Sequence, residues 1–271
     1  MVLELGPWIE RGPSHRAWSV CWNDRAGYSQ EPGYRVEGES RKQIGGFHCV
    51  GGTSLFYGGV ALRMRERDFG GYDSVAPGIS WPFDYEQLAP HYDEAERLLD
   101  VRGDDRPDAT APPRGHTVPR PAHDMSPTSR ALKAAALRLG LNPFRIPLGI
   151  DRERGPCEGC CACDGFVCDR KNDLAAAVLP RLQAAGLELR PNTVVRRLFT
   201  KGAHVVAVEA VDRISGERLR FEADRFVVAA GALATPQLLL ASGLNHRSPA
   251  RPHRGAALGR CATIHAGRRP P

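Results

Sequence analysis

The sequence predicts an α/β fold: an incomplete Rossmann-like domain that carries a three-stranded antiparallel meander and is joined to a further, partial region. Three observations support this prediction. Residues 226–230 form a continuous apolar run, which is typical of a strand buried on both faces. Gly231 and a helical segment follow that run directly. Three segments of alternating apolar and polar residues precede it, between positions 194 and 223.

The chain opens on a short apolar segment, Val2–Pro7, which we interpret as a strand that ends in a turn. The second strand of a Rossmann unit ends in an acidic residue that accepts hydrogen bonds from the adenosine ribose, and Glu4 has that position. A surface glutamate at a strand end fits the local pattern equally well. The strand, Gly-x-Gly-x-x-Gly turn and helix that should precede Glu4 are found nowhere in the sequence. We therefore expect a βα unit of roughly 30 residues to be missing.

Two helices are predicted in the middle of the chain from their end signals. Ser126 is a typical N-cap and Gly140 a typical stop, and the alanines and leucines between them form the predicted inner side. Asp173 is predicted to cap a second helix that runs through Ala185. Pro180 lies inside this second helix and should kink or shorten it.

The meander is predicted from strand-like segments that alternate with turn residues. Val194–Thr200 turns at Lys201-Gly202 into His204–Val211, and Ser215-Gly216 leads into Arg218–Ala223. Antiparallel strands joined by such short turns form a sheet of neighbours in sequence, so we expect these three strands to pair in chain order.

The last predicted helix follows the apolar run at 226–230. Thr235 is the expected N-cap, Pro236 the first helical residue and Gly243 the stop. A strand, a glycine and a helix in this order place free backbone N–H groups beside a bound phosphate or ring. This stretch therefore predicts a ligand-binding turn at Gly231.

Charge and hydropathy exclude several classes of partner. The net charge is +6, but six of the 37 basic residues follow Asn245 without any Asp or Glu, which leaves 31 basic residues to 31 acidic ones. A basic tail is usually a solvated end, so we expect no nucleic-acid partner. No apolar stretch approaches the ~20 residues of a membrane helix, and no secretory signal is visible. We therefore expect a cytoplasmic protein.

Three segments resemble, in family order, the glucose–methanol–choline (GMC) oxidoreductases, flavoenzymes that oxidise alcohols. They are the glycine-rich residues 51–59 with Arg63 beyond them, residues 81–96, and residues 226–244. The resemblance implies a discontinuous, incomplete FAD-binding domain at 1–72 and 170–245. It further implies a partial substrate-side region at 73–169, with a basic tail at 246–271 that we expect to be disordered.

The same resemblance implies a set of residues around a non-covalently bound FAD. Gly51 and Gly52 would let the main chain approach the isoalloxazine, and Thr53 and Ser54 would donate hydrogen bonds to the cofactor or cap the next helix. Phe56 occupies the position where some family members carry the histidine that binds flavin covalently. The implied cofactor-binding residues are Glu4, Gly51, Gly52, Thr53, Ser54, Val195, Gly231 and Ala232.

The implied reaction takes a hydride from a CH–OH group of an alcohol or sugar-like substrate to the flavin, while a histidine base takes the hydroxyl proton. The family's catalytic histidine segment is not matched here. His246, His253 and His265 lack its pattern, so the catalytic residues stay unknown and the chain is possibly truncated and inactive. The expected partners are a small-molecule alcohol and an electron acceptor.

Cysteines gather in one short segment and leave a second interpretation open. Cys157, Cys160, Cys163 and Cys168 have spacings that can hold zinc or an iron–sulfur cluster. Structural cysteines, reduced or in disulfides, and a redox relay fit the same spacing. The alternative function is therefore a metal-binding or regulatory module built on this segment, next to which stand Lys171, Asn172 and Asp173.

Overall fold

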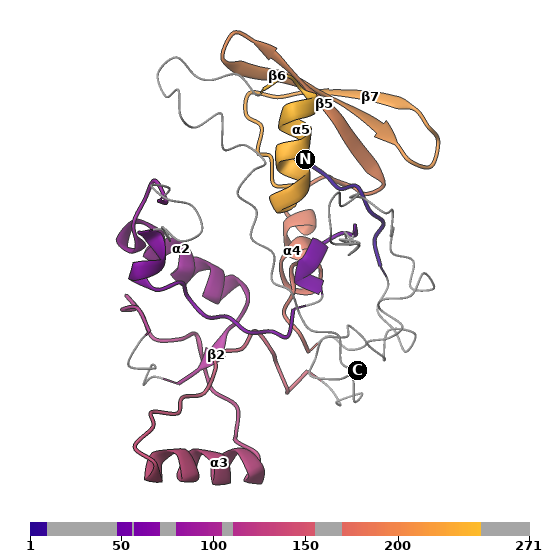
Figure 1. Cartoon of the computed structure of the whole chain (residues 1–271). Helices are drawn as coiled ribbons and strands as arrows, with labels where there is room; N and C mark the ends of the chain where they lie inside the picture. The colour runs from indigo at the N-terminus through magenta and orange to yellow at the C-terminus, as the bar shows by residue number, and fades with distance from the viewer. Residues whose placement is uncertain (10–47, 56, 71–79, 105–110, 155–169, 245–271) are drawn as a thin grey trace, which may run out of the picture. The chain divides into compact units, whose positions relative to one another are not determined.

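The computed structural model describes residues 1–9, 48–55, 57–70, 80–104, 111–154 and 170–244. Contacts between Cα atoms divide the chain into two units (Figure 1). The first consists of Met1 and Gly6–Leu189, and the second of Val2–Leu5 and Arg190–Pro271. Within the described ranges, no helix has the length and apolar character needed to cross a membrane.

The first unit consists of short helices and a small parallel sheet, connected by long loops. Its elements are η3 (Gly52–Leu55), η4 (Glu66–Phe69), α2 (Tyr85–Leu98), β2 (Arg102–Gly103), β3 (Arg120–Pro121), α3 (Pro127–Arg138), the π-helix η6 (Leu174–Val178) and α4 (Leu179–Ala184). β2 and β3 pair in parallel. The core of this unit collects apolar side chains from loops as well as helices: Cys49, Val50, Leu55, Phe69, Tyr85, Val101, Val118, Ile150 and Ala177.

Helix α2 begins where its sequence provides a complete capping box. The Asp84 side chain accepts a hydrogen bond from the Gln87 N–H at 2.9 Å, and the Asp84 N–H donates to Gln87 Oε1 at 3.2 Å. Two backbone donors that the first turn leaves unpaired are thus satisfied. Tyr85 and Glu96 are the residues of α2 that point into the core.

The predicted helix after Asp173 is confirmed, including its interruption. The Asp173 carboxylate accepts a hydrogen bond from the Ala176 N–H at 2.9 Å, as an N-cap does. The first turn is the π-helix η6, and regular α4 starts at Leu179 with Pro180 in its first turn. Pro180 cannot donate a hydrogen bond into the preceding turn, which accounts for the change of helix type there.

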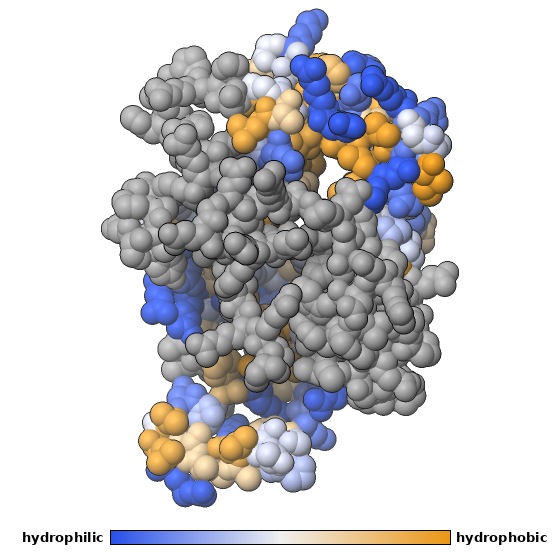
Figure 2. All heavy atoms as spheres, turned by 45° about the vertical axis from the view of Figure 1, so that its right-hand side comes forward, coloured by the Kyte–Doolittle hydropathy of each residue, from blue (hydrophilic) through white to orange (hydrophobic). Residues whose placement is uncertain are grey.

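Helix α3 is confirmed at its ends, but its predicted inner side is exposed. Ser126 Oγ accepts a hydrogen bond from the Ser129 N–H at 3.1 Å, and the helix ends before Gly140. Leu132 is 66% exposed and Leu139 is 77% exposed. Figure 2 shows hydrophobic side chains on the visible surface of α3, at the bottom of the view. The apolar residues lie on the helix as predicted, but no element in the described part of the chain covers them.

The second unit is built on the predicted meander, which is confirmed. β5 (Thr193–Lys201), β6 (His204–Asp212) and β7 (Arg218–Glu222) pair antiparallel in chain order. Leu198, Ala207, Val208 and Ala210 are the buried apolar residues of this sheet. Helix α5 (Gly231–Ala241) packs against β5, and the Leu198 N–H donates to Ser242 Oγ at 2.9 Å (Figure 1).

A short pair of strands joins the N-terminal segment to this unit. β1 (Val2–Leu3) pairs with β4 (Leu189–Arg190). The Glu4 N–H donates to the Arg190 carbonyl at 3.0 Å, and the Glu4 carbonyl accepts from the Thr193 N–H at 2.8 Å. The predicted strand at the start of the chain is therefore present, although it is only two residues long.

The strand predicted at 226–230 is wrong. These residues are not assigned to a strand, and Val227 is 92% exposed. A strand requires a neighbour that takes up its backbone N–H and C=O groups, and none of the described residues pairs with this segment. The predicted N-cap is also wrong, because α5 already begins at Gly231 and contains Thr235 and Pro236. The mixed α/β class with a three-stranded antiparallel sheet is confirmed.

Candidate functional site

The glycine-rich segment forms a tight turn in the first unit, at the start of η3. Gly51 has a φ of +91° and Gly52 a φ of +55°, conformations that favour glycine. A Cβ on Gly51 would lie 2.4 Å from Leu55 Cδ1, so internal packing also requires this glycine. A Cβ on Gly52 would meet no atom within 4 Å. Packing therefore leaves the position of a Gly52 side chain open.

The two hydroxyl residues of the turn differ in their surroundings. Ser54 Oγ donates to the Gly51 carbonyl at 2.6 Å and accepts from the Leu174 N–H at 3.3 Å. Its hydroxyl therefore ties the turn to the first residue of η6. Thr53 is exposed. Of the two side chains, Thr53 is the one whose position leaves it open to an incoming group.

Three buried polar residues, Lys171, Asn172 and Asp173, lie against this turn. Their relative exposures are 2%, 0% and 0%. Lys171 Nζ donates to the Leu55 carbonyl, and the Asn172 carbonyl accepts from the Tyr57 hydroxyl at 2.6 Å. In the sequence these residues stand out only as neighbours of the cysteine segment. The signal in the sequence that could have identified them is a run of three polar residues directly before an apolar helix.

Tyr57 has an altered acidity in this environment. Burial disfavours the phenolate, and the negative charge of Asp173 adds to this effect, which raises the pKa of Tyr57 to about 12. The hydroxyl therefore stays protonated and remains a hydrogen-bond donor up to strongly alkaline pH.

Arg63, which follows the glycine-rich segment, lies at the centre of a buried charge cluster. Its guanidinium donates to Glu96 through Nε at 2.9 Å and through Nη2 at 2.7 Å, to Tyr85 Oη at 3.1 Å, and to the Asp93 carboxylate. Arg114 binds the same Glu96 carboxylate. Two arginines and two carboxylates thus neutralise one another where little water reaches them.

The electrostatics of Arg63 follow from these contacts. Burial opposes its charge, but the hydrogen bonds that it donates to Glu96, Asp93 and Tyr85 outweigh this and raise its pKa. The sequence places Arg63 after the glycine-rich segment but does not identify its partners. Asp93 and Glu96 stand three positions apart on α2 and share one face, which was the only signal in the sequence.

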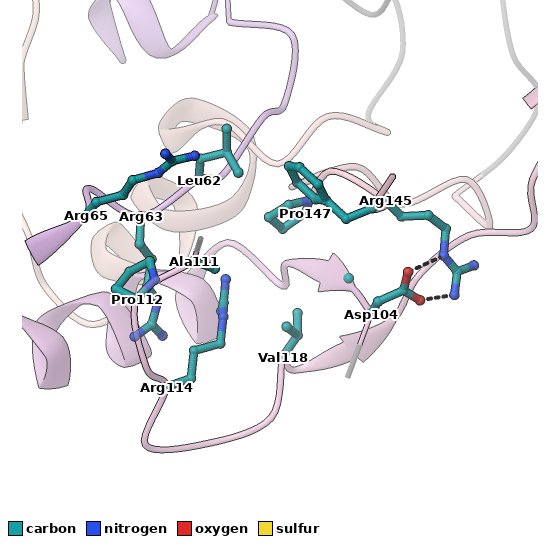
Figure 3. Close-up of a pocket in the computed structure, with 12 residues that line it drawn as sticks. Leu62, Arg63, Arg65, Asp104, Ala111, Pro112, Arg114, Val118, Arg145 and Pro147 are labelled. Atoms are coloured by element: carbon teal, nitrogen blue, oxygen red, sulfur yellow. Dashed lines mark hydrogen bonds and ion pairs between the residues drawn. The ribbon is translucent and has the colours of Figure 1, made fainter. Parts of the chain in front are cut away.

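A pocket lies beside this cluster, in the first unit. Figure 3 shows Leu62 and Arg65 at one end and the ion pair of Arg145 with Asp104 at the other. Hydrogen bonding to Arg145 lowers the pKa of the Asp104 carboxyl. None of the predicted cofactor-binding residues lines this pocket, whose residues are Leu62, Arg63, Arg65, Gly103, Asp104, Ala111, Pro112, Arg114, Val118, Phe144, Arg145 and Pro147.

The remaining predicted site residues belong to the second unit. Glu4 directly follows β1 and is hydrogen-bonded through its main chain to Thr193, the first residue of β5. Val195 lies two positions further along β5, an edge strand of its sheet in the described part of the chain. Within this unit, Glu4 and Val195 are therefore brought to the same end of β5.

Gly231 and Ala232 form the start of α5. Gly231 has a φ of +87°, and a Cβ there would meet no atom within 4 Å. The N–H groups of the first turn of a helix have no acceptor within the helix, and Ala230 provides no side-chain cap for them. A helix of 11 residues with uncapped N–H groups presents donors to an anionic or polar group.

Several predicted features lie outside the described residues. These include Phe56, the four cysteines Cys157, Cys160, Cys163 and Cys168, and the histidines after Asn245. Across the described ranges there is no group of three or more His, Cys, Asp or Glu side chains that could hold a metal ion. The proposed metal site at the cysteines is therefore neither supported nor contradicted.

Known proteins resemble this chain over most of its length. A family model described as GMC oxidoreductase matches residues 44–266. The 6'''-hydroxyparomomycin C oxidase of Streptomyces lividus is 35% identical over 205 residues, which cover 71% of this chain and 37% of that protein. The 2-methyl-1,2-propanediol dehydrogenase of Mycolicibacterium austroafricanum is 27% identical over 259 residues, covering 89% and 46%.

A solved structure supports the same relationship at the level of the fold. Pyridoxine 4-oxidase from Mesorbium loti superposes with a TM-score of 0.56 at 21% identity, over 89% of this chain and 46% of that one. The chain thus spans less than half the length of each of these three proteins. On the match of residues 44–266, which is well over half of the sequence, this chain belongs to the GMC oxidoreductases, a family of FAD-dependent flavoproteins.

Proposed function

We propose that this chain binds FAD non-covalently as part of an oxidoreductase that acts on the CH–OH group of an alcohol or sugar-like substrate. Its family and the names of its relatives, an oxidase and a dehydrogenase, support the proposal. Bound FAD would accept the hydride, while the protein supplies binding, orientation and electrostatics. The partners in this proposal are a small-molecule alcohol and an electron acceptor.

The observation that carries the proposal is the pair of glycine turns. Gly52 and Gly231 both have positive φ, and at both the position of a Cβ is empty. Other glycines that share these two features follow helices or lie in hairpin turns, whereas Gly52 and Gly231 each begin a helical element. Glycine at these positions leaves bare main chain where a flat ring or a phosphate can approach closely, which fits an FAD.

Each predicted residue then has a role that follows from its position. Gly51, Gly52 and Thr53 present backbone and hydroxyl groups to the isoalloxazine, and Ser54 holds their turn in place. Glu4 accepts hydrogen bonds from the ribose hydroxyls, and the Val195 backbone contacts the adenine. Gly231 and Ala232 contribute the uncapped N–H groups of α5.

The same proposal assigns parts of the chain to parts of the enzyme. Residues 1–72 and 170–245 form the FAD-binding region, and residues 73–169 form part of the substrate side. The Arg63 cluster links these two parts, because Arg63 belongs to the first range and its partners Asp93 and Glu96 lie on α2 in the second.

FAD binding by the purified chain tests the proposal, with Gly52→Ala as the diagnostic variant. Gly202 provides the matched control, because its φ of +60° and its empty Cβ position are like those of Gly52, but it lies in a hairpin turn. Both substitutions should cost about 1 kcal/mol of stability from backbone strain. Only Gly52→Ala should weaken FAD binding, by about tenfold or more, measured by quenching of flavin fluorescence.

Equal effects of the two substitutions on FAD affinity would contradict the assignment of Gly52. A wild-type protein that stays colourless after incubation with FAD would contradict the proposed function itself. Metal analysis of the same preparation decides the alternative. Stoichiometric zinc or iron without flavin would favour a metal-binding or regulatory module at Cys157, Cys160, Cys163 and Cys168.

A further inference from the structure

Lys171 is a fully buried lysine with a specific main-chain acceptor. Its relative exposure is 2%, and its Nζ donates to the carbonyl of Leu55, 116 positions earlier in the chain. Burying an ammonium group is costly unless it is hydrogen-bonded and compensated by charge. A lysine is therefore retained here at a cost that an apolar side chain of similar size would avoid.

The surroundings of Lys171 compensate its charge and fix its direction. Nζ lies 5.8 Å from the centre of the Tyr57 ring, within range of a cation–π interaction. The Tyr57 hydroxyl donates to the Asn172 carbonyl at 2.6 Å. Asn172 Nδ2 donates to the Leu99 carbonyl at 2.8 Å, and the Asn172 N–H donates to the Gly149 carbonyl at 2.8 Å. The segment that carries Lys171 is thus anchored on several sides.

The acceptor of Lys171 is the last residue of the glycine turn. η3 runs from Gly52 to Leu55, so the Leu55 carbonyl ends the element that Gly52 begins. Ser54 Oγ links the same turn to the Leu174 N–H. The segment from Lys171 to Leu174, which lies outside the turn, therefore holds it at two successive residues, Ser54 and Leu55.

We propose that Lys171 is a positioning residue whose buried ammonium holds the Leu55 carbonyl and so fixes the Gly51–Gly52 turn in the conformation that receives the flavin. This inference rests on the proposed function, because the turn is the proposed contact with FAD. Two adjacent positive-φ glycines have many alternative conformations, so the turn needs an external restraint. Lys171 supplies this restraint without placing a side chain on the side of Gly52 that would face the cofactor.

Lys171→Met tests this role, because methionine keeps the length of the stem and removes the ammonium group. Lys201→Met is the matched control, since Lys201 is exposed at the end of β5. The Gly52 N–H donates to the Cys49 carbonyl at 2.8 Å and the Ser54 N–H to the Gly51 carbonyl at 3.3 Å, so exchange of these amide hydrogens reports opening of the turn. Exchange at both should become about tenfold faster in Lys171→Met and stay unchanged in Lys201→Met.

Cofactor binding provides the second measurement. In Lys171→Met the dissociation constant of FAD should rise about tenfold or more, and the visible band of the bound flavin should change shape, at a temperature where circular dichroism shows the protein folded. Lys171→Arg keeps a cationic donor and should bind FAD more tightly than Lys171→Met. A merely structural lysine would give equal FAD affinities in the folded wild type and Lys171→Met, and that result would overturn the proposal.

The two measurements separate this inference from the proposed function. If the wild type binds no FAD, the proposed function fails, and unchanged amide exchange in Lys171→Met would overturn the restraint as well. If Lys171→Met does not fold, Tyr57→Phe decides. It removes only the hydroxyl that anchors Asn172, and it should speed exchange at Gly52 and Ser54 severalfold. Exchange equal to wild type in folded Tyr57→Phe would then overturn the proposal.

Discussion

Arg63 illustrates how a charged residue is accommodated where water is scarce. Its side chain is 2% exposed, and the carboxylates of Glu96 and Asp93 both bind it. Arg114 provides a second cation for Glu96. Because these carboxylates are compensated by cations in a buried environment, removing one partner leaves a buried charge poorly balanced, and the cost exceeds the value of the lost hydrogen bonds.

Substitution of Arg63 by methionine should therefore destabilise the protein by about 3 kcal/mol. The control is Arg97→Met, because Arg97 also binds a glutamate on α2 but its side chain is 69% exposed. Exposed pairs contribute little, so Arg97→Met should leave the urea midpoint unchanged. Both are measured by urea unfolding monitored by circular dichroism. A midpoint for Arg63→Met equal to that of wild type would show that the cluster is not closed to water.

Tyr57 should impose an alkaline limit on stability. Its pKa is raised in the folded protein from 10.0 to about 12 by burial and by Asp173, so the folded state holds the proton more tightly than the unfolded state. Stability from this source is complete below pH 10 and is lost as pH rises towards 12. Urea midpoints measured between these pH values should fall for wild type and fall less for Tyr57→Phe. Parallel curves would contradict the burial of Tyr57.

Sequence reasoning at this scale succeeded for residues whose conformation is local. The glycines before Thr53 predict a turn, because the conformation of a turn depends on the backbone freedom of its own residues. The partners of Lys171 and Arg63 could not be predicted, since Leu55 is 116 positions from Lys171 and Glu96 is 33 positions from Arg63. No periodicity or spacing connects positions so far apart.

Secondary-structure elements were predictable where turn or capping residues at their ends stabilise them. The β5–β6–β7 meander has its turns at positive-φ glycines, Gly202 and Gly216, and the caps at Ser126 and Asp173 formed as predicted. The segment 226–230 failed because strand pairing depends on a neighbour elsewhere in the chain. Likewise, the apolar side of α3 could be recognised from sequence, but the sequence does not say whether another element covers it.

The exposed side of α3 gives a prediction that distinguishes it from a core helix. Leu132 and Leu137 are 66% and 55% exposed, so replacing both with lysine should leave the free energy of unfolding within about 0.5 kcal/mol of wild type. Lysine forms helices about as well as leucine. The double substitution should also reduce binding of the dye 8-anilinonaphthalene-1-sulfonate, which reports exposed apolar surface.

Leu198→Ala is the contrast for this experiment. Leu198 is 3% exposed in the sheet of the second unit, and its truncation should cost about 2–5 kcal/mol. Similar losses in the α3 double variant and in Leu198→Ala would mean that the α3 leucines are covered in solution.

At the scale of the whole molecule, the positive charge is distributed unevenly along the sequence. All of the excess is accounted for by six arginines after Asn245, and the remaining chain has 31 basic and 31 acidic residues. Many of these basic and acidic residues form ion pairs with one another within the described part of the chain, among them Arg63 with Glu96 and Arg145 with Asp104. A balanced surface has little long-range attraction for polyanions.

A chain that ends at Asn245 should therefore lose the affinity for polyanions that a net charge of +6 gives the full sequence. Retention on a heparin column at low salt should drop to the level of a neutral protein, while urea unfolding stays unchanged. The full-length chain with glutamine at the six arginine positions is the control and should elute with the shortened chain, because charge and not length decides retention. Salt-sensitive DNA binding that persists in both variants would instead place a nucleic-acid site on the body of the protein.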